Sequence, residues 1–215
     1  MKLFKAVLIL SFSLAIVFTA GCQKTEVTLG EMESNTYTND FFGLQIDKPE
    51  NWISLSQEEL EEVNQTGKDT IGEFNEEVAQ NLDLASERNL NLFAFWEYPL
   101  THSGDFNSSI GCAAENLTLA GILKVKTGAD YLEIVRDTIE ETGMPYEFGQ
   151  LSSEKIDGKK IDVLPMTLTM QGVKVYQKYY ARIIKGYAIC FYTTYVTDSQ
   201  LEALQSIVDT MEIAK

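Results

Sequence analysis

The chain has 215 residues, of which 45% are hydrophobic and 11% aromatic, enough for one domain with a sizeable core. With 32 acidic against 17 basic residues, its formal net charge at pH 7 is −15. This acidity argues against binding to nucleic acid, or to anionic lipid through a basic patch. Solubility of the folded part is the simplest explanation of the charge.

Residues 1–21 have the pattern of a secretory signal peptide. Lys2 and Lys5 precede an apolar run over 6–18, and three small residues then lead directly to Cys22. The run is shorter than the roughly 20 apolar residues that a membrane-spanning helix needs. Cleavage after residue 21 would make the net charge two units more negative, because two lysines and no acid would be lost.

A cysteine directly after Ala20-Gly21 makes this segment resemble a bacterial lipoprotein signal, although Thr19 stands where such signals usually carry Leu. The resemblance implies that Cys22 is diacylated on its sulfur and becomes the mature N-terminus. Stable anchoring takes two or more acyl chains. We therefore expect a protein tethered by lipid at the outer face of a bacterial membrane. An uncleaved anchor or an ordinary secretory signal is the alternative.

The polar segment 22–35 is predicted to be a flexible tether, and the folded domain is expected to span 36–215. Two short strands are expected first, at 36–38 and 43–47, joined through the turn pair Asn39-Asp40.

Two helices are expected next. Ser56 and Glu59 form a capping-box pattern that predicts the start of the first. Gly67 is expected to interrupt it, and Asp69 to cap the second. The apolar residues of the second helix recur at helical spacing; they are Ile71, Phe74, Val78 and Leu82.

The middle of the chain alternates strand and helix patterns. Residues 90–98 and 110–119 are predicted strands, separated by a polar loop. Residues 131–142 are a predicted helix, with Asp130 at its start and Gly143 after its end.

The C-terminal third has the clearest pattern. Asp157-Gly158, Gln171-Gly172 and Lys185-Gly186 are two-residue turns between β-rich runs. Such short connections force neighbouring strands to be antiparallel, which predicts a four-stranded meander. A final helix is expected from Thr197 or Asp198, with Leu204 and Val208 against the sheet. The predicted strands are 151–156, 159–170, 173–184 and 187–196. The predicted class is α+β, an antiparallel sheet with helices packed on it.

This order of elements resembles the PsbP-like family. The likeness rests on the stretch Phe42-Gly43-Leu44-Gln45-Ile46-Asp47-Lys48-Pro49-Glu50-Asn51-Trp52, and on a meander followed by Thr197-Asp198-Ser199-Gln200-Leu201 and a helix ending near Met211-Glu212-Ile213. It covers about residues 36–213, with 56–84 as a helical insertion. It implies an α/β/α sandwich used for binding or scaffolding, usually without catalysis, and it identifies no photosystem partner for this chain.

Catalytic and metal-binding patterns are sparse. His102 is the only histidine, and its neighbours Ser103 and Asp105 cannot form a triad because triad partners converge from separated elements. Asp105, Asn107 and Ser109 have the spacing of the first three ligands of an EF-hand loop. Ile110 then stands where the loop needs Gly, and Asn116 where it needs Glu. A cation in this loop is a weak alternative.

Cys112 and Cys190 both lie in strand-like runs. Outside the cytoplasm, the oxidising environment permits a disulfide between them. The alternative is that both are buried free thiols. No cofactor is predicted. The hypothesis favoured by the sequence is a non-catalytic, membrane-anchored lipoprotein that binds an envelope protein or a small molecule. An envelope-acting hydrolase using carboxylates and a cation-binding module are the alternatives.

Overall fold

The computed structural model describes residues 27–86, 89–118, 124–170 and 172–213. Within these ranges the chain has an α+β fold, with two antiparallel sheets and four helices. The larger sheet contains β4 (Ile53–Ser54), β5 (Asn89–Trp96), β6 (Ser109–Asn116), β7 (Tyr146–Phe148), β8 (Ser152–Ile156), β9 (Lys159–Met170), β10 (Val173–Ile184) and β11 (Tyr187–Tyr195). Its order is β4-β5-β6-β11-β10-β9-β7, and β8 also pairs with β9.

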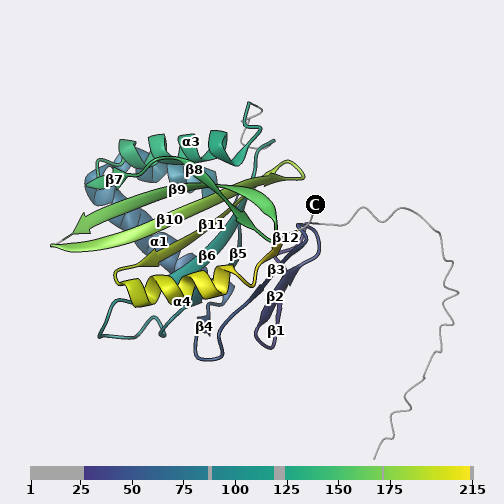
Figure 1. The fold of residues 1–215 in the computed structure, drawn as a ribbon. Coiled ribbons are helices and arrows are strands. Elements are labelled where there is room, and N and C mark those ends of the chain that lie inside the picture. The colour runs from purple at the N-terminus through teal and green to yellow at the C-terminus, as the bar shows by residue number, and fades with distance from the viewer. Residues whose placement is uncertain (1–26, 87–88, 119–123, 171, 214–215) are drawn as a thin grey trace, which may run out of the picture.

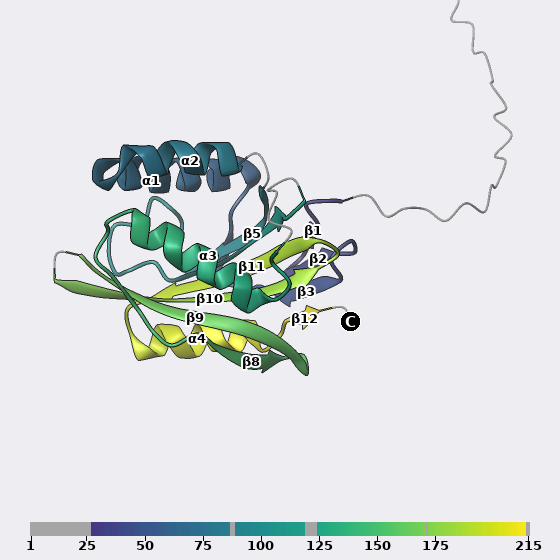
Figure 2. The same ribbon diagram turned by 90° about the horizontal axis from the view of Figure 1, so that it is seen from above.

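The smaller sheet joins the two ends of the described chain (Figure 1). Its order is β1-β2-β3-β12, formed by β1 (Glu31–Glu33), β2 (Thr36–Asn39), β3 (Leu44–Asp47) and β12 (Glu212–Ile213). The helices are α1 (Gln57–Phe74), α2 (Glu76–Ser86), α3 (Gly128–Glu141) and α4 (Asp198–Val208). Figure 2 shows α3 and the α1–α2 pair on one side of the larger sheet and α4 on the other. We call these two sides the α3 face and the α4 face.

The C-terminal meander predicted from the turns is confirmed, since β8, β9, β10 and β11 pair antiparallel in chain order. At two turns both central residues have positive φ: 50° and 70° at Asp157-Gly158, and 51° and 82° at Lys185-Gly186. This is the conformation that type I′ turns require. Successive residues of β11 then point alternately to the α3 and the α4 face.

The α4 face carries the main core. Ile189 and Phe191 of β11 point into it, and the Phe191 ring stacks on Tyr180 of β10 with 4.5 Å between centroids. Leu204 of α4 and Ile46 of β3 cover the same core, and each is 1% exposed. Burying a large apolar side chain stabilises a fold by about 1.5–3 kcal/mol, so most of the stability lies on this face.

Two of the meander turns also contact the smaller sheet. Asp157 accepts a hydrogen bond from the Ile213 N–H at 3.2 Å and forms an ion pair with Lys159. Lys185 donates to the Phe41 carbonyl oxygen at 2.6 Å, and its Nζ lies 4.8 Å from the centre of the Phe41 ring. These turns therefore reverse the chain and hold the two sheets together.

The boundaries of the helices before β5 differ from the prediction. The capping box of Ser56 and Glu59 is confirmed, but Gly67 does not interrupt the helix. A glycine costs about 1 kcal/mol relative to Ala in a helix, which is too little to break one of 18 residues. The break comes at Asn75, whose backbone is extended and whose side-chain oxygen accepts a hydrogen bond from the Val78 N–H.

The two later helices also end or begin elsewhere than predicted. α3 begins at Gly128, capped by Thr127, with Asp130 completing its capping box. α4 begins after Thr197 as predicted but ends at Val208, short of 211–213. Glu212 and Ile213 instead pair with β3.

The chain is also ordered earlier than expected. β1 lies inside the segment predicted as a tether, and the Tyr37 hydroxyl donates to the Leu29 carbonyl oxygen at 2.7 Å. The folded part therefore begins before Thr36.

Candidate functional site

The pair α1–α2, residues 57–86, contacts the rest of the fold at its start, at the junction of the two helices and through Val78, which is buried. In α1 only Leu60 is buried, in a small cluster with Leu55, which follows β4, and Ala94 of β5. At the junction of the two helices, the Asn75 side-chain NH₂ donates to the Glu141 carbonyl oxygen of α3 at 2.8 Å. Away from these contacts a hollow remains between the pair and α3.

The helix α3 is fixed tightly at its N-terminus. A Cβ atom on Gly128 would lie only 2.0 Å from the Ala181 carbonyl oxygen of β10, so only glycine allows this approach. The next residue, Ala129, donates its N–H to the Asp162 carboxylate at 3.0 Å. Leu132 is fully buried beneath the helix. The flank of α3 that faces α1–α2 therefore has a defined position.

A hollow of about 420 Å³, partly open to solvent, lies between these helices on the α3 face. Ile71 and Val78 line it from the α1–α2 side, and Ile134, Val135 and Ile139 line it from α3. We call this site the cleft. Small-molecule sites are typically concave and mostly apolar, with a few placed polar groups, and the cleft has this character.

The polar groups of the cleft lie toward its floor on the sheet. Glu115 of β6 accepts a hydrogen bond from the Tyr131 hydroxyl of α3 at 3.0 Å through Oε2. Tyr179 of β10 lines the floor beside them. Burial raises the pKa of both tyrosines well above the usual value, and neighbouring Cys190 and Glu115 add to the shift at Tyr131. Tyr131 therefore stays neutral and remains a hydrogen-bond donor to the carboxylate.

A pair of stacked tyrosines on the α3 face extends from this floor. Tyr179 and Tyr192 stack with 5.5 Å between ring centroids. Tyr192 lies over Gly111, where a Cβ would meet its hydroxyl oxygen at 2.6 Å. A small residue in β6 thus makes room for an aromatic side chain in β11.

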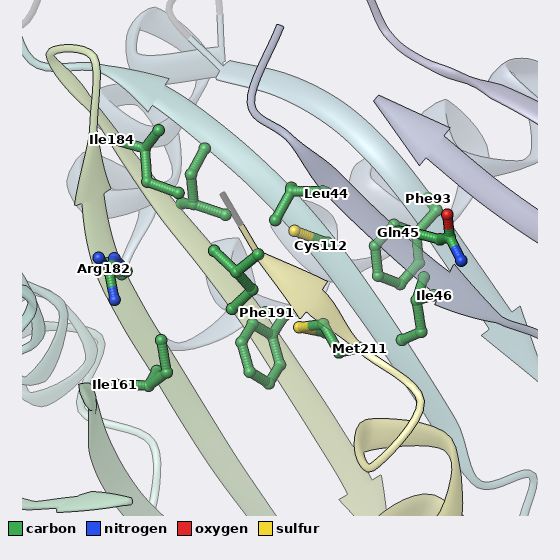
Figure 3. A pocket seen from close by; sticks show the side chains of 12 residues that line it. Leu44, Gln45, Ile46, Phe93, Cys112, Ile161, Arg182, Ile184, Phe191 and Met211 are labelled. Atoms are coloured by element: carbon green, nitrogen blue, oxygen red, sulfur yellow. The ribbon is translucent and has the colours of Figure 1, made fainter. Parts of the chain in front are cut away.

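A second hollow, shown in Figure 3, lies between the two sheets. Its cavity volume is only about 10 Å³, and its lining is almost wholly apolar, including Leu44, Cys112, Phe191 and Met211. Arg182 at its side donates to the Lys160 carbonyl oxygen at 3.4 Å. A dry apolar gap offers no polar group to orient a ligand. We interpret it as a small packing gap within the main core.

The three loop residues considered for a cation have separate environments. Asn107 is committed to the backbone of Tyr98, accepting from its N–H at 2.8 Å and donating to its carbonyl oxygen at 2.8 Å. Ser109 is buried in β6, and Asp105 is exposed. The Asn107 side-chain oxygen is therefore not free for a cation. Across the described ranges, no three His, Cys, Asp or Glu residues come close enough to hold a metal ion.

The two strand cysteines are free and buried. The register pairs Cys112 with Phe191 and Cys190 with Ala113. Because neighbours along a strand point to opposite faces, Cys112 faces the α4 side and Cys190 the α3 side. Burial raises the pKa of both thiols, that of Cys190 to about 12. A disulfide needs side chains directed at each other, so this register excludes the bridge that the sequence left open.

Two other predictions concern single residues. Cys22 and the signal segment 1–21 lie outside the described residues. His102 stacks on Tyr98 with 4.2 Å between ring centroids.

Sequence reasoning missed both polar residues of the cleft floor. In sequence, Glu115 is one residue of a predicted strand and Tyr131 the first residue of a predicted helix. One signal is present: Glu115 follows the apolar run Ile110-Gly111-Cys112-Ala113-Ala114 in its strand. A charged residue in such a position is seldom buried without a partner.

In the part of the chain that the structure describes, we find no helix that is both long and apolar enough to cross a membrane. No known family model matches the chain, and no curated protein matches it in sequence.

Solved structures share part of its shape. PsbP (CyanoP) from Synechocystis sp. PCC 6803 is 13% identical and covers 90% of this chain and 100% of its own, with a TM-score of 0.49. LpqN, involved in cell envelope biogenesis of Mycobacterium tuberculosis, is 13% identical over 80% of this chain and 83% of its own, with a TM-score of 0.40. PA94, a Pseudomonas aeruginosa protein of unknown function, is 15% identical over 57% of this chain and 81% of its own, with a TM-score of 0.41. The chain is similar to each of these proteins in the arrangement of its elements.

Proposed function

We propose that this chain is a lipid-tethered, extracytoplasmic binding module that holds a small molecule in the cleft. The observation that carries the proposal is the cleft itself, about 420 Å³ between α3 and the α1–α2 pair. Apolar side chains from both sides line it, and a carboxylate with a tyrosine hydroxyl lies at its floor. This is the combination by which proteins hold and orient small molecules.

The membrane tether in this proposal is supported by the N-terminal sequence, in which small residues lead directly to Cys22.

The same proposal assigns the domain to the PsbP-like pattern. Its support is the order of elements and the Pro49–Trp52 stretch, where the Trp52 N–H donates to the Pro49 carbonyl oxygen at 3.0 Å and the Trp52 ring is buried. That stretch packs the core and has no catalytic part.

We propose binding without catalysis. A carboxylate hydrolase needs two carboxyl groups poised as acid and base across one pocket. Glu115 is engaged by Tyr131, whereas Glu141 is exposed at the rim. The carboxyl groups whose pKa is shifted among the described residues are all shifted downward, at helix caps or at a turn: Glu59, Asp130 and Asp157. None of these features favours acid–base chemistry in the cleft.

Native mass spectrometry of the chain isolated from bacterial membranes tests the binding. We expect an adduct of discrete mass that is lost on denaturation. Thr138→Trp, which fills the cleft from α3, should abolish the adduct. Glu133→Trp, on an exposed position of the same helix, should keep it. A bare mass for the unaltered chain would overturn the small-molecule proposal and favour a protein partner.

The tether has its own test. The denatured chain should have the mass of residues 22–215 plus a diacylglycerol group, and Cys22→Ser should lose that group. An unmodified mass with the N-terminal segment retained would contradict the tether and leave the binding proposal standing.

A further inference from the structure

The walls of the cleft carry charge of one sign. Among the described residues that line it, Glu115 and Glu141 are acidic and none is basic. The whole chain is also acidic, with a net charge of −15. The potential inside a partly enclosed acidic cleft attracts cations and repels anions.

Only one of the two oxygens of the Glu115 carboxylate accepts a hydrogen bond from a described residue. Its Oε2 accepts a hydrogen bond from Tyr131, and no basic side chain among the described residues forms an ion pair with it. Oε1 accepts no hydrogen bond from a described residue and is not among the buried polar atoms that lack a partner, so it is accessible to solvent on a side chain that lines the cleft. A carboxylate with one fixed and one open oxygen is a ready acceptor for a charged N–H donor, which forms hydrogen bonds stronger than neutral ones.

The groups around that oxygen also suit a cation with an apolar part. Tyr131 and Tyr179 place aromatic rings at the floor, and the face of such a ring attracts an ammonium group. Ile134 and Val135 on α3 would contact the apolar remainder of a ligand. A small cation without carbon would leave these walls uncovered, and an anion would be repelled by Glu115.

On the basis of the proposed function, we propose that the cleft takes a small organic amine whose ammonium group binds Glu115 beside Tyr131 and Tyr179. The apolar part of the amine packs against the α3 flank. Selectivity for the positive charge comes from the open oxygen of Glu115, and the Tyr131 hydroxyl holds that carboxylate in place.

Three matched probes test this inference: 2-phenylethylamine, the neutral 2-phenylethanol and the anionic 3-phenylpropanoate. Binding of each to the full chain, isolated from bacteria, is followed by NMR of the methyl groups of Ile134, Ile139 and Val78, which line the cleft. We expect the amine to shift these signals with a dissociation constant roughly 10-fold or more below that of the alcohol, the usual gain of a charge-assisted hydrogen bond. The anion should bind weakest.

Variants assign the preference to one carboxylate. Glu115→Gln keeps the shape of the side chain and should make the amine and the alcohol bind alike. Glu141→Gln, at the rim, should keep the preference. Tyr131→Phe removes the hydroxyl and leaves the carboxylate, so the preference should survive. If Glu115→Gln fails to fold, the comparison of the probes on the unaltered chain still decides the matter.

The outcomes separate the two proposals. Equal binding of amine and alcohol at the cleft methyl groups would overturn the inference and leave the binding function intact. Loss of the preference in Glu141→Gln in place of Glu115→Gln would overturn the assignment to the floor. If no probe moves these methyl signals, the amine inference falls, and the adduct in native mass spectrometry decides the binding function separately.

Discussion

The two faces of the larger sheet differ in how completely they are covered. On the α4 face, one helix and the smaller sheet bury large apolar side chains such as Phe191 and Leu204 to 3% exposure or less. On the α3 face, α3 packs closely but the α1–α2 pair stands away and leaves the cleft. One strand, β11, contributes to both faces. The main core and the cleft are therefore divided between alternate residues of the same strands, so one set can change without the other.

The largest expected effect comes from truncating one residue on each face. Leu204→Ala on α4 should lower the free energy of unfolding by about 2–5 kcal/mol, because it empties a fully buried site. Ile134→Ala, in the half-buried wall of the cleft, should cost about 1 kcal/mol, since solvent already reaches this side chain. Urea unfolding measures both. Equal losses would mean that α1–α2 closes over α3 in solution and that the faces do not differ.

A smaller effect is expected where α3 meets the sheet. Gly128→Ala would place a methyl group against the Ala181 carbonyl oxygen of β10, a backbone atom that cannot move alone. We expect a loss of about 1–3 kcal/mol, with NMR changes confined to the α3 face. Gly67→Ala is the matched control: nothing lies within 4 Å of its Cβ, and it should stabilise the protein by up to about 1 kcal/mol. A neutral Gly128→Ala would show that α3 is not fixed by this contact.

Low pH should lower the free energy of unfolding through two carboxyl groups, one near each face of the larger sheet. Hydrogen bonds from the Lys126 N–H and from Thr127 lower the pKa of Asp130 at α3, and the Lys159 side chain and the Ile213 N–H lower that of Asp157 beside the smaller sheet. A lowered pKa in the folded state means that the stabilisation is complete above the ordinary value of 3.8 and is lost as the pH falls through the folded value.

Thermal unfolding followed by circular dichroism between about pH 2 and pH 6 measures this loss. Asp130→Asn and Asp157→Asn should each flatten the fall in midpoint at the acid end. An unchanged slope in both variants would show that other groups control acid unfolding.

The smallest effect concerns a buried hydroxyl on the α4 face. Thr193 is 2% exposed, and its Oγ1 has no hydrogen-bond partner among the described residues. Thr193→Val keeps the shape and removes the unsatisfied group, so stability should be unchanged or rise by up to about 1 kcal/mol. Urea unfolding again provides the measurement. A clear loss would indicate that a water molecule satisfies this hydroxyl within the core.

The meander could be predicted accurately because its turns are set locally. Asp157-Gly158 and Lys185-Gly186 specify positive φ at adjacent residues, and the strand lengths between the turns then determine the pairing. By contrast, β12 has only two residues, and its conformation depends on β3, which is far away in sequence. No local pattern distinguishes such a segment from the end of a helix.

The cleft was not predictable for a similar reason. Glu115 and Tyr131 lie on a strand and a helix whose packing depends on the close approach of Gly128 to β10. The loop residues Asp105 and Asn107 have a spacing that is visible in sequence, yet in the structure Asn107 only secures the backbone of Tyr98. Spacing along the chain identifies sites built within one loop, and this site is built between elements.

The smaller sheet is completed by the pairing of β12 with β3, and this step comes late in synthesis. The Thr210 side chain accepts a hydrogen bond from the Asp47 N–H, 163 residues away in sequence, and β12 completes the smaller sheet just beyond it. A nascent chain therefore holds the edge of β3 open until residues 212–213 are made, and contacts of such long range form slowly.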